Sequence, residues 1–171
     1  NRYPDRDAVT LRGALAKFIN SLSGTSFGAQ EIWAANGSNE IIQSLFMAFG
    51  ERPALGFTPS YSMHPLIAKV IGTKWNDGGR RADFSLDLAK AISDIAKVKP
   101  GLTFITTPNN PTGTTVTLAE IEDLAIATGK INGLLIVDEA YAEFSDQASA
   151  VTLLAKYSNL VVIRTMSKAF A

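Results

Sequence analysis

The stretch LLIVDEAY at residues 134–141 decides the fold of this chain. It opens with four consecutive apolar residues, and such a short run of branched side chains is typical of a strand buried on both faces, as in a parallel sheet. Asp138 follows at the carboxyl end of this strand, which is the edge where ligands of open α/β sheets bind. A buried carboxylate is costly unless a cationic group meets it. Asp138 therefore either binds a ligand or only caps the following turn.

The rest of the chain alternates helix patterns with strand patterns. We predict helices at residues 7–22, 41–49, 62–71, 86–95, 117–125 and 148–157. We predict further strands at residues 32–35, 54–57, 73–75, 102–106 and 160–163. This alternation predicts an α/β fold, a three-layer sandwich in which helices cover both faces of a mostly parallel sheet. The sequence has no internal repeat and no low-complexity linker, so residues 1–171 are expected to belong to one domain.

The composition is ordinary for a soluble globular protein and excludes several classes of function. Sixteen basic and sixteen acidic residues cancel, which gives no electrostatic reason to expect binding to nucleic acid or to an acidic membrane. The absence of cysteine excludes a disulfide scaffold and thiolate metal sites, and a single histidine disfavours a histidine-based metal site. No apolar run approaches the roughly 20 residues that span a bilayer. We therefore expect a cytoplasmic protein that holds no metal.

Six short motifs occur along the chain, each of them weak when taken alone. They are NRYPD at 1–5, NGSNE at 36–40, PSYSMH at 59–64, PNNPTG at 108–113, VDEAYAEF at 137–144 and RTMSKAF at 164–170. In this order they resemble the pyridoxal-phosphate-dependent aminotransferases of the aspartate aminotransferase fold, and within that family they are most similar to the histidinol-phosphate branch. The resemblance implies the large cofactor-binding domain of a fold-type I enzyme.

The resemblance implies pyridoxal 5'-phosphate as the cofactor and assigns catalytic roles to three residues. Lys168 matches the lysine that binds the cofactor covalently and then moves the proton, and Asp138 matches the partner of the pyridine nitrogen. A nearby anion keeps that nitrogen protonated, so that the ring can accept electrons. Tyr141 and Asn110 match the residues that bind the ring hydroxyl oxygen. Without the resemblance, Lys168 would be read as a solvated lysine, Tyr141 as a core residue and Asn110 as part of a turn.

The cofactor phosphate is expected at the small residues Gly37, Ser38 and Asn39. A loop that opens a helix presents unpaired backbone N–H groups and the positive end of the helix dipole, although a plain N-cap is compatible with the same residues. Thr165 and Ser167 match further hydroxyl contacts of the family to the phosphate.

Two tyrosines complete the site that the resemblance implies. Tyr61 matches the aromatic that stacks on the pyridine ring, and Tyr3 matches a residue that reaches across a homodimer to the neighbour's phosphate. On their own they would be read as a core aromatic and as part of an extended N-terminal segment. His64 receives no catalytic role.

The family reaction would transfer an amino group between histidinol phosphate and 2-oxoglutarate, with glutamate as the other product, in histidine biosynthesis. The chain starts at Asn1 and stops three residues after Lys168, so we expect a piece of a longer protein that lacks an N-terminal segment and the C-terminal small domain. Such a piece is expected to be inactive alone.

Three alternatives remain open. A threonine-phosphate decarboxylase or another class I/II aminotransferase would share the cofactor site. A non-enzymatic alternative is the aminotransferase-like sensing domain of a transcription regulator. A Rossmann-type nucleotide domain also has parallel strands, but the sequence lacks a Gly-x-Gly-x-x-Gly motif after a strand.

Overall fold

The structure is a computed structural model that describes residues 3–170. The chain forms two compact units, one within residues 1–36 and the other within residues 37–171. In the described part of the chain, no helix has both the length and the apolar character needed to cross a bilayer.

The first unit contains one long helix and one short turn of helix. Helix α1 (Val9–Ser23) confirms the predicted amphipathic helix, and η1 (Ala29–Glu31) is a single 3₁₀ turn. The strand predicted at residues 32–35 is wrong, because this segment follows η1 without joining a described sheet. Its first carbonyl is bound by a side chain instead: Arg12 Nε donates to the carbonyl oxygen of Ile32 at 2.7 Å. A strand requires a partner ladder, which local sequence cannot supply.

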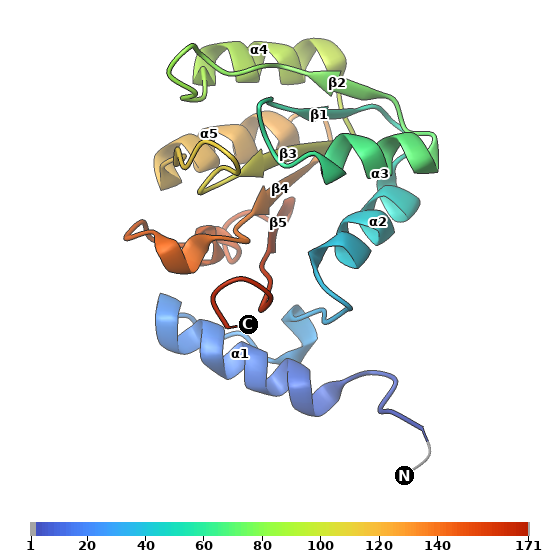
Figure 1. The fold of residues 1–171 in the computed structure, drawn as a ribbon, viewed down its shortest axis with the longest axis vertical. Helices are drawn as coiled ribbons and strands as arrows, with labels where there is room; N and C mark the ends of the chain where they lie inside the picture. The colour runs from blue at the N-terminus through green and yellow to red at the C-terminus, as the bar shows by residue number, and fades with distance from the viewer. Residues whose placement is uncertain (1–2, 171) are drawn as a thin grey trace. The chain divides into compact units, whose positions relative to one another are not determined.

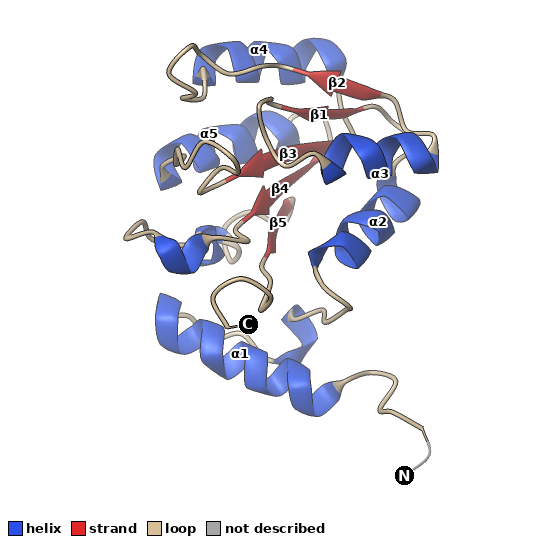
Figure 2. Ribbon diagram, in the orientation of Figure 1, coloured by secondary structure: helices blue, strands red, loops and turns tan. Residues whose placement is uncertain are grey.

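The second unit is built on a parallel sheet of five strands (Figures 1 and 2). The strands are β1 (Ala54–Gly56), β2 (Trp75–Asp77), β3 (Leu102–Thr106), β4 (Leu134–Asp138) and β5 (Leu160–Ile163), in the spatial order β2-β1-β3-β4-β5. All four neighbouring pairs are parallel, so the carboxyl ends of all five strands meet at one edge. The predicted α/β fold with a parallel sheet is confirmed.

Helices cover both faces of this sheet, as Figure 2 shows. Helices α2 (Ser38–Phe49) and α3 (Met63–Ile71) lie on one face, and α4 (Leu88–Val98) and α5 (Leu118–Gly129) lie on the other. Helix α5 begins with a capping box, in which the Thr117 hydroxyl accepts from the Glu120 N–H and the Glu120 carboxylate accepts from the Thr117 N–H. The helix predicted at 148–157 is reduced to the 3₁₀ turn η3 (Ala150–Leu153), and a second 3₁₀ turn, η2 (Ala142–Phe144), follows β4.

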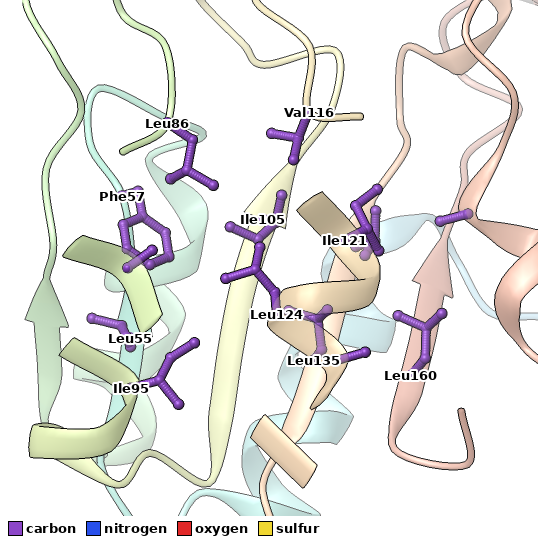
Figure 3. Packing of buried hydrophobic residues seen from close by; sticks show 14 residues of the cluster. Leu55, Phe57, Leu86, Ile95, Ile105, Val116, Ile121, Leu124, Leu135 and Leu160 are labelled. Atoms are coloured by element: carbon purple, nitrogen blue, oxygen red, sulfur yellow. The ribbon is translucent and has the colours of Figure 1, made fainter. Parts of the chain in front are cut away.

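Alternate residues of the central strands fill two separate cores. Leu55, Ile105 and Leu135 point toward α4 and α5, in the core drawn in Figure 3. Phe104 and Ile136 lie in the other core, under α2 and α3. Both faces of each central strand are therefore buried, which explains why the strand sequences are unbroken apolar runs.

We expect Leu135→Ala to lower the free energy of unfolding by about 2–5 kcal/mol, because Leu135 is fully buried and its loss leaves a cavity between β4 and α5. Chemical denaturation followed by circular dichroism measures this change. The control is Leu66→Ala, since Leu66 is half exposed on α3 and its loss should cost less than about 1 kcal/mol. Equal losses in the two variants would contradict the proposed packing of β4.

Candidate active site

The candidate site lies at the carboxyl edge of the sheet in the second unit. There β4 ends at Asp138, and β5 runs into the turn that carries Lys168. The chain after β1 reaches Tyr61 just before α3, and the chain after β3 forms the loop of Asn110. Four residues predicted from separate motifs therefore lie at or after the carboxyl ends of strands, which the parallel sheet brings to one edge. They are Asp138, Lys168, Tyr61 and Asn110.

Asp138 is buried, with 1% of its surface exposed, and both of its carboxylate oxygens are bound within the protein. His64 Nε2 lies 3.0 Å from Asp138 Oδ2, and the Ala140 N–H donates to Oδ1 at 3.1 Å. Carboxylate oxygens accept hydrogen bonds, so this contact is a hydrogen bond when His64 Nε2 carries a proton. This contact provides the partner that a buried carboxylate needs at this position.

His64 is the functional candidate that the sequence analysis missed. It is 2% exposed in α3, where its ring stacks on Phe104 with centroids 4.7 Å apart and meets the edge of Tyr61 at 5.4 Å. The available signal was its separation of three residues from Tyr61, which a turn brings together: the His64 N–H donates to the Tyr61 carbonyl oxygen at 3.4 Å. The sequence could not show that His64 meets the end of β4, 74 residues away.

The loop predicted to bind the phosphate opens α2. Gly37 adopts φ 77°, a left-handed conformation that favours glycine, and the first turn of the helix follows with Ser38 and Asn39. The first backbone N–H groups of a helix have no partner within the helix and favour an anion. The Tyr61 hydroxyl donates to Asn39 Oδ1 at 3.1 Å, so the predicted stacking aromatic touches the predicted phosphate loop.

Lys168 and Tyr141 lie close together, on the segments that follow β5 and β4. Lys168 is exposed, and its Nζ lies 5.8 Å from the centre of the Tyr141 ring, within the range of a cation–π contact. Tyr141 and Asn110 line the same surface hollow of about 520 Å³. On the turn before Lys168, the hydroxyls of Thr165 and Ser167 are 2.9 Å apart.

The structure thus describes two groups of contacts among the predicted site residues. One joins Asp138 to Asn39 through His64 and Tyr61, and the other joins Lys168 to Asn110 through Tyr141 and the shared hollow. Within residues 3–170, no hydrogen bond joins Lys168 directly to Asp138. Tyr3 belongs to the first unit and is 88% exposed.

A buried acid stands next to Asp138. Glu139 is 3% exposed and accepts from the Ser149 hydroxyl at 2.6 Å and from the Ala150 N–H at 2.7 Å. Burial raises the pKa of the Glu139 carboxyl above its ordinary value, although these two hydrogen bonds act in the opposite direction. Arg164 Nη1 lies 3.9 Å from Glu139 Oε2, and Arg164 Nη2 donates to Glu143 Oε1 at 2.7 Å.

A comparison with protein families matches residues 1–171 to aminotransferase class I and II. The chain belongs to this family. Histidinol-phosphate aminotransferase of Nocardia farcinica is 53% identical over 174 residues, which cover all of this chain and 44% of that protein. The enzyme of the same name from Mycobacterium marinum is 52% identical, with all of this chain and 45% of that protein covered. The chain therefore spans less than half the length of these curated relatives.

Solved structures of aminotransferases share the fold. The histidinol-phosphate aminotransferase from Clostridium acetobutylicum superposes with a TM-score of 0.81 at 29% identity, covering 99% of this chain and 48% of that chain. The aromatic aminotransferase from Pyrococcus horikoshii gives 0.86 at 22% identity, with 99% and 48% covered. A Sinorhizobium meliloti histidinol-phosphate aminotransferase, solved in complex with pyridoxal-5'-phosphate, gives 0.84 at 22% identity and covers 99% of this chain and 45% of that one.

The residues of this chain fit the chemistry of a phosphorylated pyridine aldehyde. A buried carboxylate can face a ring nitrogen, an exposed amine on a turn can reach an aldehyde, and a helix N-terminus can accept a phosphate. All three groups belong to the second unit of this chain.

Proposed function

We propose that this chain is the cofactor-binding part of a pyridoxal-phosphate-dependent histidinol-phosphate aminotransferase. The enzyme would exchange an amino group between histidinol phosphate and 2-oxoglutarate, with glutamate as the second amino acid, in histidine biosynthesis. The observation that carries the proposal is the buried Asp138 at the end of β4, bound by His64, in a chain 53% identical to an enzyme of that name. Neither a sensing domain nor a Rossmann-type domain accounts for this combination.

Two residues would act directly on the cofactor and substrate. When bound, pyridoxal phosphate supplies an electron-accepting ring and an aldehyde. From its exposed position beside Tyr141, Lys168 would hold that aldehyde and then carry the proton that the amino-bearing carbon of the substrate loses to the cofactor. Asp138 would keep the ring nitrogen protonated. Each of its carboxylate oxygens accepts one described hydrogen bond, which leaves a second lone pair for that contact.

The remaining contacts would orient the cofactor. The Tyr141 hydroxyl and the Asn110 amide would donate to the ring oxygen, and Tyr61 would pack against the ring face. The backbone N–H groups at Gly37, Ser38 and Asn39, together with the hydroxyls of Thr165 and Ser167, would hold the phosphate.

The whole enzyme would contain more than these 171 residues, since the matched relatives are more than twice as long. We infer that residues 1–171 form part of the large cofactor-binding domain of a cytoplasmic homodimer. Tyr3 would then serve the phosphate site of the neighbouring subunit. We expect the isolated chain to have no transaminase activity.

The substrate is tested with the complete enzyme. We expect kcat/KM for histidinol phosphate to exceed that for aspartate and for phosphothreonine, and dephosphorylated histidinol to be a much poorer substrate, because a phosphate dianion binds through charge-assisted hydrogen bonds that histidinol cannot make. A coupled 2-oxoglutarate or glutamate assay measures each substrate. Release of carbon dioxide from phosphothreonine at a comparable rate would instead identify a threonine-phosphate decarboxylase.

His64 is expected to act as a positioning residue through Asp138. His64→Phe keeps a ring against Phe104 but deletes the 3.0 Å contact, so we expect kcat to fall about tenfold, which corresponds to one lost hydrogen bond to a charged group. His64→Gln retains an N–H donor and should recover part of the loss, whereas a purely structural role predicts no such recovery. A wild-type kcat in His64→Phe would show that Asp138 does not depend on His64.

A further inference from the structure

We propose that Arg164 is a positioning residue that sets the place of the Lys168 amine by tying the Lys168 turn to the segment that carries Tyr141. This inference rests on the proposed function, because it concerns the lysine assigned to the cofactor. Neither Arg164 nor its partners Glu139 and Glu143 has a role in the site as derived so far.

Arg164 is the first residue after β5, four residues before Lys168. The end of β5 just before Arg164 is held to the segment after β4, since the Glu139 N–H donates to the Ile163 carbonyl oxygen at 2.8 Å. Figure 1 shows this segment, in dark red, continuing from the carboxyl end of β5 into the turn. A side chain that leaves the chain at this point can therefore connect a rigid strand end to its surroundings.

The partner of Arg164 belongs to the segment of Tyr141. Glu143 lies in η2, two residues after Tyr141, and its Oε1 accepts from Arg164 Nη2 at 2.7 Å. Lys168 Nζ approaches the Tyr141 ring between the same two segments. The ion pair and the lysine–ring contact therefore both connect the segment after β4 to the segment after β5. Loss of the ion pair is expected to shift Lys168 relative to Tyr141.

The Arg164–Glu143 ion pair is partly shielded from solvent, so it can hold the two segments in a fixed relative position. The side chains of Arg164 and Glu143 are each 17% exposed, unlike the pairs on the surface of the molecule. Exposed pairs contribute little because water and salt screen them, whereas a partly buried charge-assisted hydrogen bond keeps its geometry.

A second carboxylate, that of Glu139, also lies near the Arg164 guanidinium. Glu139 lies 3.9 Å from Arg164 Nη1, and the negative charge of Glu143 helps to raise the pKa of Glu139. Two acids therefore meet one guanidinium beside the end of β4. Both acids belong to the segment after β4, so removal of the guanidinium would delete the charged group that links this segment to the turn after β5.

The experiment compares four variants of the complete enzyme stripped of cofactor. Each is mixed with pyridoxal phosphate and cyanoborohydride, and mass spectrometry measures the rate at which the pyridoxyl group is fixed on Lys168. We expect the rate to fall about tenfold in Arg164→Met and in Glu143→Gln, as for one lost charge-assisted hydrogen bond. Glu143→Gln keeps the shape of the side chain and removes the charge of the same ion pair, so it still tests the inference if Arg164→Met does not fold. Arg164→Lys retains the charge and should lie within about threefold of wild type.

Arg52→Met is the matched control. Arg52 also makes several hydrogen bonds, but to the carbonyls of Lys99, Pro100, Ile131 and Asn132, which are at the opposite edge of the sheet. It should lower the melting temperature and leave the rate of fixation on Lys168 unchanged. A wild-type rate in both Arg164→Met and Glu143→Gln would overturn this inference alone. Fixation on a lysine other than Lys168 in the unaltered enzyme would overturn the proposed function as well.

Discussion

Lys168→Ala is expected to abolish turnover and the visible absorbance that develops when the complete enzyme binds pyridoxal phosphate. The reason is that, in the proposed mechanism, Lys168 would supply both the amine that holds the cofactor and the base that moves the proton, and alanine has neither. Loss of a covalent catalyst and a proton carrier together costs at least about 10⁴-fold in kcat. Absorbance spectroscopy and a transaminase assay measure the two effects in one preparation.

The control for this change is Lys156→Ala. Lys156 is also exposed, but its Nζ forms an ion pair with Glu122 at 2.6 Å. It precedes the amino end of β5, whereas Lys168 follows the carboxyl end. This variant should retain wild-type absorbance and turnover. Sustained turnover in Lys168→Ala above the level of an uncatalysed reaction would remove Lys168 from the proposed mechanism.

Asp138→Asn is expected to lower kcat by about 10²-fold or more, equivalent to about 2.7 kcal/mol of transition-state stabilisation. Asparagine has nearly the same volume and can still accept from His64, so the packing of β4 should survive. What disappears is the negative charge that, in the proposed site, would favour the protonated ring nitrogen. Steady-state kinetics with histidinol phosphate separate kcat from KM.

Asp94→Asn provides the comparison for this second prediction. Asp94 pairs with Lys90 on α4, so its change removes one carboxylate without touching the carboxyl edge of β4. It should leave both kinetic constants unchanged. If Asp138→Asn altered only KM, Asp138 would be a binding residue and the proposed role in holding a proton on the ring would be wrong.

Much of the fold could be predicted from the sequence, because a strand buried on both faces appears in the sequence as a short apolar run. The runs that became β3, β4 and β5 are apolar on both faces, and the structure confirms each of them within one residue. The capping box at Thr117 was equally readable, since it depends on two residues three positions apart. Predictions failed where an element depends on distant partners: residues 32–35 join no strand, and the segment at 148–157 forms only η3.

The candidate site shows the same division. Asp138, Lys168 and the glycine-led start of α2 stood out from local patterns and from their resemblance to a family. His64, Glu139 and the Arg164–Glu143 pair did not, because each owes its importance to a contact with another element. A lone histidine on an apolar helix face looks the same in sequence whether it meets a leucine or a buried carboxylate.

The sequence by itself therefore determined the fold class, the family and the residues that carry reactive groups, because these depend on burial pattern and on short motifs. Only the tertiary structure decided which groups meet. His64 binds Asp138 across 74 residues of chain, and Arg164 reaches Glu143 across 21. The physical reason is that parallel strands bring their carboxyl ends to one edge, so contacts are made between segments that local sequence preferences cannot relate.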